Sequence, residues 1–470
     1  MNSKKISTVG ATTLTRGTIA RYAVGSFGTG GFSTLPGLVL VYYLTDNLGV
    51  TALFAGVIVT VAKVWDIVID PMIGGLSDRA LARTGSRRGP MMLGVIGLPL
   101  AFVLTFAAPE GLTPVVAGLW VFIAYVAAET FFSLFQVPYT SLPAELTDGY
   151  HERTRLLTWR VVVLTIAILL FGAGGPAIRG MFRDNPSLGY LVMGIVSAAL
   201  IGLGLWIATS VVPRGNPAPT SLDQYPAFSL AHYRDGIQAL RESPAFRALL
   251  GTGILQAIAV GLMLAAGQFV ATWVLHKENA VMPLFLALVA PAVLFAPVWQ
   301  LIALRIGKER AFSLASIVYL VATILLVGLL WAPGWWMLAP LALAGAAYAG
   351  LQSLPFAMLP DVISHEAAST DSAKGRAGIF GGVWTAGETA GLAFGSTLLT
   401  IVLACTGYIE SAGTATVEQP ASAVTGIVVT FSLLPAVLMG LSLITLKRYR
   451  LRESDLATST TGAHVAHPEA

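Results

Sequence analysis

Three ionisable residues lie in an otherwise apolar stretch of the chain, spaced to share one face of a helix. Residues 52–62 are Ala, Leu, Phe, Gly, Val or Ile apart from Thr60, yet Lys63, Asp66 and Asp70 follow at positions i, i+3 and i+7. A charged side chain at the centre of a bilayer costs about 3 kcal/mol, so this stripe is expected to face a polar interior. Paired carboxylates there could hold H⁺ or Na⁺, and we predict a cation site at Asp66 and Asp70. The alternative is a structural Lys–Asp ion pair followed by an acid at the helix end.

The composition is that of an integral membrane protein. The 470 residues are 55% hydrophobic and 11% charged, whereas about a quarter of the residues in a soluble protein are charged. The single cysteine, Cys405, excludes an intramolecular disulfide and a cysteine-based metal cluster. The sequence contains no phosphate-binding loop, dinucleotide fingerprint or hydrolase motif, and no nucleophile–base pair at membrane depth. We therefore expect a protein that is not an enzyme and that needs no cofactor beyond a bound cation.

Twelve apolar segments have about the length of 20 residues that a spanning helix needs. They are residues 22–45, 52–76, 90–108, 113–142, 158–178, 188–212, 247–275, 280–304, 311–331, 336–360, 376–404 and 422–446. With the N-terminus inside, 24 of the 28 Lys and Arg residues fall in cytoplasmic pieces, and the outer loops hold only Arg179, Arg183 and Lys277. This asymmetry predicts that both termini are cytoplasmic, and it explains the net positive charge without nucleic-acid binding.

Two helix ends repeat the same pattern six segments apart. Gln136, Pro138, Pro143 and Glu145 close the fourth segment, and Gln352, Pro355, Pro360 and Asp361 close the tenth. Such an internal repeat is typical of an all-α protein of two homologous six-helix halves, with its binding site between them at mid-membrane. We predict an N-terminal half (1–212), a cytoplasmic linker (213–246), a C-terminal half (247–446) and a cytoplasmic tail (447–470).

The loop from Gly75 to Arg88 is short, basic and bounded by glycine. It resembles the loop between helices 2 and 3 of the major facilitator superfamily, in which an Asp and an Arg clamp neighbouring helix ends during the transport cycle. The resemblance implies a twelve-helix major facilitator fold and a role in conformational gating for basic and acidic residues at the cytoplasmic helix ends. These residues are Asp78, Arg79, Arg83, Arg153 and Arg376.

Longer motifs resemble one family within that superfamily, the glycoside–pentoside–hexuronide:cation symporters, which are similar to melibiose permease. The matches are Tyr42-Tyr43-Leu-Thr-Asp46, Lys63-x-x-Asp66-x-x-x-Asp70-Pro71, Pro138-Tyr-Thr-Ser-Leu-Pro143, residues 146–160 and residues 375–385. The resemblance makes Asp66 and Asp70 the cation-binding carboxylates, with Lys63 beside them. It also implies that Ser133 assists the cation and that Arg160 lines the sugar cavity.

The chain departs from the family at several expected sugar ligands. Gly30 and Gln136 stand where the family has carboxylates, and Thr389 stands where it has a lysine. Glu388 precedes Thr389 and adds an acid, which we assign to cation coupling, ahead of Glu129. Substrate contacts are expected from Gly30, Gln136, Tyr139, Arg160, Trp384 and Thr389.

A further departure concerns the coupling ion. Ile69 replaces an amide beside Asp70, which favours H⁺ over Na⁺ because protonation needs only one carboxylate. The predicted function is cation-coupled symport of a sugar or glycoside by alternating access, across a bacterial inner membrane and as a monomer in the lipid bilayer. The alternatives are a non-sugar substrate, such as an organic acid or a lipid-like molecule, and a membrane sensor that does not transport.

Overall fold

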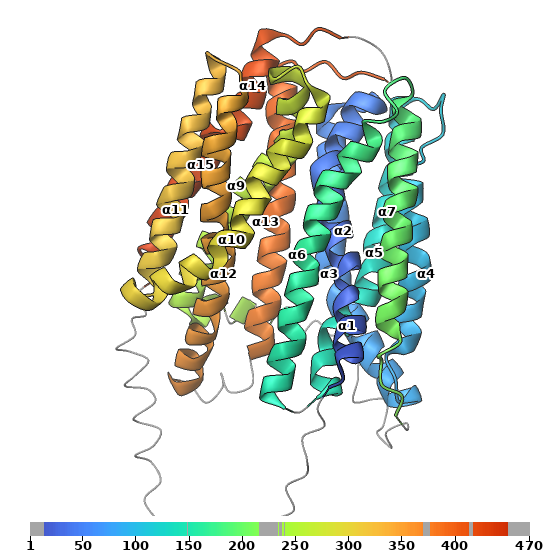
Figure 1. The fold of residues 1–470 in the computed structure, drawn as a ribbon, viewed down its shortest axis with the longest axis vertical. Coiled ribbons are helices and arrows are strands. Elements are labelled where there is room, and N and C mark those ends of the chain that lie inside the picture. Colours follow the sequence, from blue (N-terminus) through green and yellow to red (C-terminus); the bar gives the residue numbers. More distant parts are fainter. Residues whose placement is uncertain are drawn as a thin grey trace, which may run out of the picture.

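The computed structural model describes residues 14–147, 149–215, 234, 237–238, 240–369, 377–412 and 417–449. These residues form a bundle of long helices, of which twelve are long and apolar enough to cross a membrane (Figure 1). The twelve spans confirm the predicted number. Most of the linker and the tail after Tyr449 lie outside the described residues.

The first six spans make up the N-terminal half. They are α1 (Arg16–Val24) with α2 (Ser26–Tyr42) and a π-helical turn (Tyr43–Asn47), then α3 (Ala52–Thr84), α4 (Arg88–Thr105), α5 (Pro114–Leu146), α6 (Tyr150–Arg179) and α7 (Pro186–Thr209). Proline at the first position starts α5 and α7, where its missing N–H leaves no bond unmade. Gly85 ends α3 with a φ of 67°, a left-handed conformation that glycine adopts without steric cost.

The last six spans make up the C-terminal half. They are α9 (Pro244–Phe269) with a π-helical turn (Val270–Val274), α10 (Val281–Ile306), α11 (Lys308–Leu325), α12 (Leu338–Ser369), α13 (Ala377–Cys405), and α14 (Ala421–Phe431) with α15 (Leu433–Leu446). The repeated proline pairs lie inside α5 and α12, as the sequence pattern predicts.

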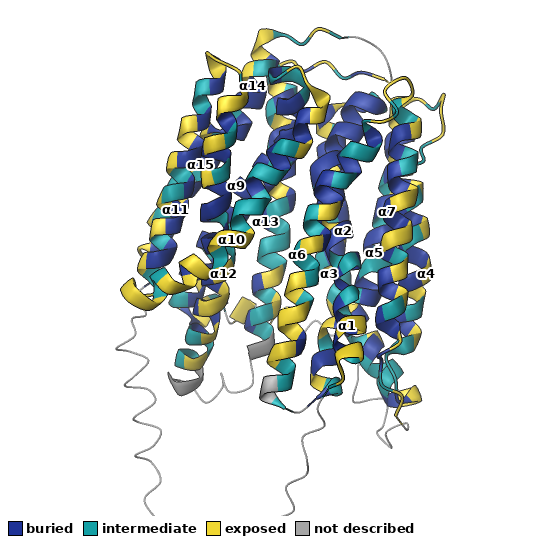
Figure 2. Ribbon diagram, viewed as in Figure 1, coloured by how far each residue is buried: buried dark blue, intermediate teal, exposed yellow. Residues whose placement is uncertain are grey.

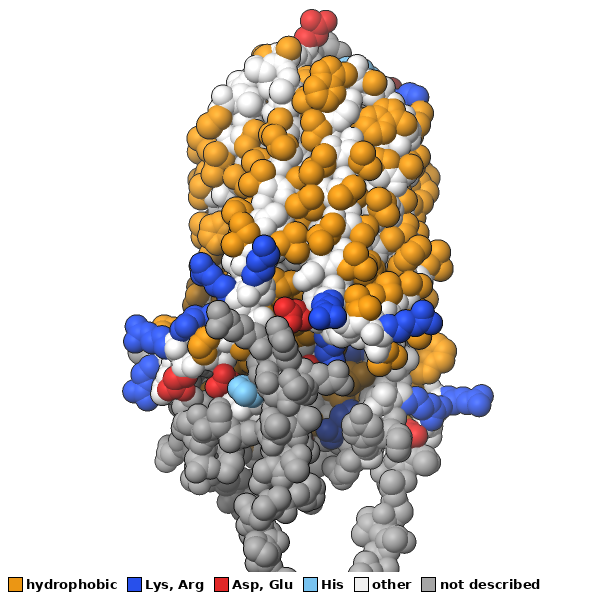
Figure 3. Space-filling model, turned by 90° about the vertical axis from the view of Figure 1, so that its left-hand side faces the viewer, with side chains coloured by type: hydrophobic (Ala, Val, Ile, Leu, Met, Phe, Trp, Pro, Cys, Tyr) orange, Lys and Arg blue, Asp and Glu red, His pale blue; other side chains and the backbone are white. Residues whose placement is uncertain are grey.

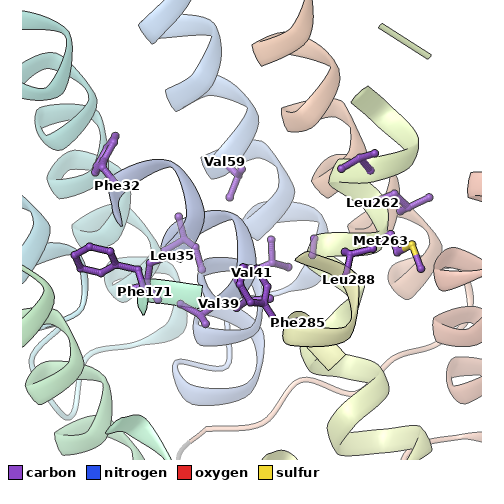
Figure 4. Close-up of a cluster of buried hydrophobic side chains, with 14 of the residues drawn as sticks. Phe32, Leu35, Val39, Val41, Val59, Phe171, Leu262, Met263, Phe285 and Leu288 are labelled. Atoms are coloured by element: carbon purple, nitrogen blue, oxygen red, sulfur yellow. The ribbon is translucent and has the colours of Figure 1, made fainter. Parts of the chain in front are cut away.

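The halves pack together mainly through α3 with α13, α6 with α10, and α2 with α9, and α2 also contacts α13. Buried side chains from both halves belong to one cluster (Figure 4), and across it the rings of Tyr42 of α2 and Phe269 of α9 lie 5.1 Å apart between centroids. At Gly172 of α6, the ring of Phe285 occupies the space that a Cβ atom would need. The absence of a side chain there lets α6 and α10 approach closely.

The hydrogen bonds that join the halves gather at one end of the bundle. Within the described part of the chain they include the bonds between residues 45–60 and 397–412, and we call this region the closed end. Its centre is the buried carboxylate of Asp46, which accepts hydrogen bonds from Tyr408 Oη at 2.5 Å and Thr45 Oγ1 at 2.5 Å. The hydroxyl of Ser411 donates to the backbone carbonyl of Asp46 at 3.3 Å, and Glu410 accepts from the Ala52 amide at 2.7 Å.

The Tyr408→Phe variant is expected to shift the protein away from the closed conformation. The substitution removes a donor from a buried carboxylate, which costs about 1–3 kcal/mol, and only the state with the halves joined at this end carries that cost. The population of that state should therefore fall at least several-fold. Electron–electron distances between spin labels at Glu110→Cys and Glu418→Cys, in a Cys405→Ser background, would show a larger share of long distances.

Tyr319→Phe is the matched control for that measurement. The Tyr319 hydroxyl contacts Met263 Sδ at 3.2 Å inside the C-terminal half and does not reach the other half. Its removal should leave the distance distribution as in the parent chain. An unchanged distribution in Tyr408→Phe would contradict the assignment of Asp46 and Tyr408 as the contact that holds this end closed.

The surface of the bundle suits a bilayer. Helix faces that point outward carry the exposed residues, while the faces between helices are buried (Figure 2). In the space-filling view, hydrophobic side chains cover most of the height, and Lys and Arg gather toward one end (Figure 3). That end lies opposite the closed end, and the sequence pattern predicts that it faces the cytoplasm.

Candidate functional site

Helices α3 and α5 run side by side and bring the predicted cation residues onto facing surfaces. Lys63 Nζ of α3 lies 2.5 Å from Glu129 Oε1 of α5. One turn further along both helices, the Ser133 hydroxyl donates to Asp66 Oδ1 at 2.9 Å. The offset between partners stays nearly constant because the two helices run in the same direction. The predicted proximity of Lys63, Asp66 and Ser133 is therefore present.

The partner of Lys63 is Glu129 and not one of the aspartates of its own helix. The carboxylate of Glu129 is fully buried, and the rings of Phe32 and Tyr125 lie 5.5 and 5.8 Å from the Lys63 ammonium. A buried charge is tolerable only when paired in this way. Our sequence reading ranked Glu129 behind Glu388. The signal that could have found it is the spacing of Glu129, Ser133 and Gln136, which lie at i, i+4 and i+7 on one face of α5.

Pairing of Lys63 with Glu129 leaves the two aspartates for another cation. Asp66 is 8% exposed, and Asp70, one turn further along α3, is half-buried. Together with the Ser133 hydroxyl they offer a set of oxygen atoms, which is the donor type that Na⁺ and H⁺ use. A cluster of three or more His, Cys, Asp or Glu residues suited to a metal ion is not found among the described residues.

Accessible positions on α2 define a face toward the inside of the bundle, which we call the cavity face. Helix α2 is enclosed by α3, α5, α6, α7 and α9, so an exposed side chain in its middle faces the inside of the bundle. Ser33 is exposed, and Thr29 and Gly37 are half-buried, at a spacing of four residues. The Thr29 hydroxyl donates to Gln136 Oε1 of α5 at 2.7 Å. Gln136 therefore lies next to this face.

Gly30 does not share that face, which corrects our expectation of a substrate contact. It is buried against α6, where a Cβ atom would lie 2.7 Å from the Cβ of Ala167. The sequence placed the expected contact in the correct turn of α2 but at a position one residue away. One residue corresponds to a rotation of about 100° around the helix axis. Thr29 is the neighbouring residue that reaches Gln136.

Tyr139 and Arg160 form one unit between α5 and α6. Tyr139 is fully buried, its hydroxyl donates to the Tyr22 carbonyl at 2.7 Å, and its ring lies 5.2 Å from the Arg160 guanidinium. Tyr139 thus supports Arg160 and is not itself exposed to the cavity. Arg160 is half-buried, and its buried Nε atom has no hydrogen-bond partner among the described residues.

The predicted residues of α13 lie in a separate pocket of the C-terminal half. Glu388 and Trp384 line it together with Tyr348 and Gln352 of α12. The Gln352 amide donates to the Tyr348 hydroxyl at 2.6 Å. Thr389 is half-buried beside Glu388. No described contact joins Glu388 to the aspartates of α3.

The gating cluster is centred on Arg87, which our sequence reading did not single out. Its guanidinium lies 2.6 Å from Asp78 Oδ1, donates to Ser77 Oγ at 2.8 Å and forms an ion pair with Glu145 at the end of α5. Burial alone would lower the pKa of Arg87, but the bonds to the two carboxylates raise it above its usual value, so it remains charged. In the C-terminal half, Lys308 Nζ pairs with Asp361 at 2.5 Å in the corresponding place.

The other predicted gating residues differ in how far they are buried and in what they contact. Arg79 is half-buried on α3, Arg83 is exposed, and Arg153 donates to the Thr147 carbonyl at 3.1 Å. Arg376 lies outside the described residues. Asp78 of this set forms an ion pair between helix ends, with Arg87.

The chain is similar to known transport proteins over much of its length. An uncharacterised symporter of Synechocystis sp. is 26% identical over 481 residues, which is 83% of this chain and 85% of that protein. A putative sulfoquinovose importer of Salmonella typhimurium is 31% identical over 39% of each chain. The crystal structure of a D-xylose–proton symporter superposes with a TM-score of 0.65 over 93% of this chain and 98% of its own, at 12% identity. The MFS/sugar transport protein family matches residues 21–453, and the chain belongs to this family of membrane transporters.

Proposed function

We propose that the protein is a cation-coupled symporter that carries a sugar or glycoside across the cell membrane. The observation that carries the proposal is the cluster of Asp66, Asp70 and Ser133 at membrane depth, with Lys63 already neutralised by Glu129. Among the described residues, no ion pair neutralises Asp66 or Asp70, so these carboxylates at membrane depth need a cation. A transporter that moved its substrate without coupling, or a sensor, would have no use for them.

The geometry supports a cycle of alternating access. The halves are held together at the closed end through Asp46 and Tyr408, so the cavity face of α2 opens toward the opposite end. Binding of a cation to Asp66 and Asp70 would remove the repulsion between the acids and let the halves rock about the site. The Arg87 and Lys308 clusters tie helix ends within each half, so that each half moves as one body.

Substrate would bind next to the acids, between the halves. The Thr29–Gln136 pair offers a hydrogen-bond donor and acceptor on the cavity face, and Arg160, which lies against the Tyr139 ring, offers a guanidinium. These are the group types that recognise sugar hydroxyls. The replacement of an amide by Ile69 favours H⁺ as the coupling ion, whereas the oxygen set of Asp66, Asp70 and Ser133 also suits Na⁺.

Transport by the purified protein in proteoliposomes tests this proposal. Vesicles with an inward H⁺ gradient, an inward Na⁺ gradient or neither would be offered radiolabelled xylose, glucose, galactose and their methyl glycosides. We expect concentrative uptake of at least one of them with one gradient and only equilibration without it. Equal uptake with and without gradients would overturn cation coupling. Concentrative uptake of an organic acid or a lysophospholipid in place of any sugar would support the alternative substrate on the same scaffold.

A further inference from the structure

Three loops meet around a hollow at the closed end of the bundle. It is lined by Arg183 from the loop between α6 and α7, by residues 276–280 before α10, and by Trp335 before α12. Its volume of about 580 Å³ lies within the ~300–1,000 Å³ that sites for small molecules occupy. Because Arg183 belongs to the N-terminal half and the other residues to the C-terminal half, the hollow straddles the interface between the halves.

The two halves touch directly beside this hollow. A Cβ atom at Gly180, the residue that follows α6, would lie 2.8 Å from Asn279 Oδ1 of the C-terminal half. The guanidinium of Arg179 lies 5.6 Å from the ring centroid of Tyr42, which precedes Asp46 by four residues. The hollow therefore lies near the hydrogen-bonded centre of the closed end, and the two form and separate together.

Basic side chains gather around the hollow although few are present at this end. The outer loops predicted from the sequence hold three Lys and Arg residues, and all three lie in the hollow or next to it: Arg179, Arg183 and Lys277. Glu278 lies close enough to the buried Arg179 for their charges to interact. The ion pairs of the described residues involve neither Arg183 nor Lys277, and Asp184 does not line the hollow. Two positive charges thus face the hollow without an acid of their own.

The position of the hollow favours a lipid headgroup over an anion in solution. Trp331, Trp335 and Trp336 are exposed between α11 and α12, and exposed tryptophans gather where the hydrocarbon core meets the headgroups. Met181 and Met282 lie near the lining residues in the chain and are exposed as well. The hollow thus combines positive charge with apolar surface, which is the combination that a phospholipid presents in complementary form.

We propose that this hollow binds the phosphate of an anionic phospholipid of the phosphatidylglycerol type, and that the bound lipid favours the state closed at this end. The Arg183 guanidinium and the Lys277 ammonium donate to phosphate oxygens, one from each half. The Trp335 ring, whose centroid lies 5.1 Å from the ammonium, holds Lys277 in place. A ligand bound by both halves binds best when they are together, so it shifts the equilibrium toward that state. This inference goes beyond the proposed function and does not depend on which substrate is carried.

Thermal unfolding of the purified full-length protein in mixed micelles tests the site. Micelles that contain dioleoylphosphatidylglycerol are compared with micelles that contain dioleoylphosphatidylcholine, which carries a phosphate but no net charge. Phosphatidylglycerol should raise the unfolding temperature of the parent chain by several degrees, since a ligand of the folded state stabilises it by mass action. The double variant Arg183→Gln, Lys277→Gln should lose most of that rise.

A second double variant is the matched control. Arg310→Gln with Lys447→Gln removes the same two kinds of charge from exposed positions at the start of α11 and the end of α15. Both positions belong to the C-terminal half and lie at the opposite end of the bundle, so a lipid bound there does not join the halves. This variant should keep the rise seen with the parent chain.

Spin-label distances test whether the lipid favours closure. The labels at Glu110→Cys and Glu418→Cys, in the Cys405→Ser background, would be measured in nanodiscs of either lipid. The ratio of short to long distances in the parent chain should be about ten-fold higher in phosphatidylglycerol. The same comparison in Tyr408→Phe, which we expect to populate both states, should show the same direction. The ratio in Arg183→Gln, Lys277→Gln should be equal in the two lipids.

Four results would overturn the proposal. Absence of a temperature rise with phosphatidylglycerol in the parent chain would exclude the site. An equal loss of the rise in both double variants would show a general attraction between the lipid and basic side chains. The same rise with inorganic phosphate or glycerol 3-phosphate, added to phosphatidylcholine micelles, would make the hollow a site for a soluble anion. Equal distance ratios in the two lipids, in the parent chain and in Tyr408→Phe, would refute the link between the lipid and closure.

Discussion

Asp66→Asn proteoliposomes should equilibrate the substrate across the membrane but no longer concentrate it. The substitution keeps the size of the side chain and its bond to the Ser133 hydroxyl, and it removes the charge that a cation neutralises. Asp70 is then the one acid left of the proposed pair, and we expect that it does not couple the ion gradient to the substrate by itself. The accumulation ratio at steady state should fall from well above one to about one. Exchange of substrate between equal concentrations should continue.

Two further variants make this result interpretable. Asp184→Asn is a matched control, because Asp184 is exposed in the loop between α6 and α7. It should concentrate substrate as the parent chain does. Asp70→Asn should resemble Asp66→Asn if both acids hold the cation. Normal accumulation by Asp66→Asn would refute the assignment of this residue to cation coupling.

Glu129→Gln should destabilise the protein more than any other single substitution of a polar residue that we describe. It leaves the Lys63 ammonium in the membrane without its partner, and breaking a buried ion pair from one side costs about 3–5 kcal/mol. The cation–π contacts of Lys63 with Phe32 and Tyr125 are present in the parent chain as well, so they do not replace the lost ion pair. Thermal unfolding in detergent should therefore occur several degrees lower than in the parent chain.

Removal of both charges should restore most of that stability. The double variant Lys63→Met, Glu129→Leu replaces the pair by apolar side chains of similar volume, which is often neutral or stabilising. Its unfolding temperature should lie close to that of the parent chain, and Glu110→Gln provides the control for a Glu→Gln change at an exposed position. A Glu129→Gln variant as stable as the parent chain would show that Lys63 finds another partner, with Asp66 the nearest acid on its own helix.

The number of spanning helices and the equivalent ends of α5 and α12 can be predicted from features visible in the sequence. Apolar segments of about 20 residues predict spanning helices because the bilayer fixes their length. The matching proline pairs predict equivalent helix ends, and the structure places Pro138 and Pro355 in corresponding helices. The helical spacing of Lys63, Asp66 and Asp70 predicted a shared face, and the first two indeed meet partners on the same neighbouring helix.

Contacts between helices were harder to predict because they depend on the rotation of each helix about its axis. A shift of one residue turns a side chain by about 100°, which is why Thr29 lies on the cavity face while Gly30 packs against α6. The pairing of Arg87 with Glu145 joins residues 58 positions apart, and no local pattern selects Arg87 from the neighbouring arginines. The roles of Tyr139 and Glu388 likewise depend on neighbours that are distant in sequence.

The internal pairing of Lys63 with Glu129 has an electrical consequence. Since these two charges cancel, the site carries the charge of Asp66 and Asp70 alone, which is two negative charges when both are ionised. One bound monovalent cation leaves a single negative charge, so the empty and loaded carriers respond differently to a transmembrane voltage. Moving one elementary charge through a potential of 100 mV changes the free energy by about 2.3 kcal/mol. A negative potential inside the cell would thus drive the empty site outward, which is the return step of an importer.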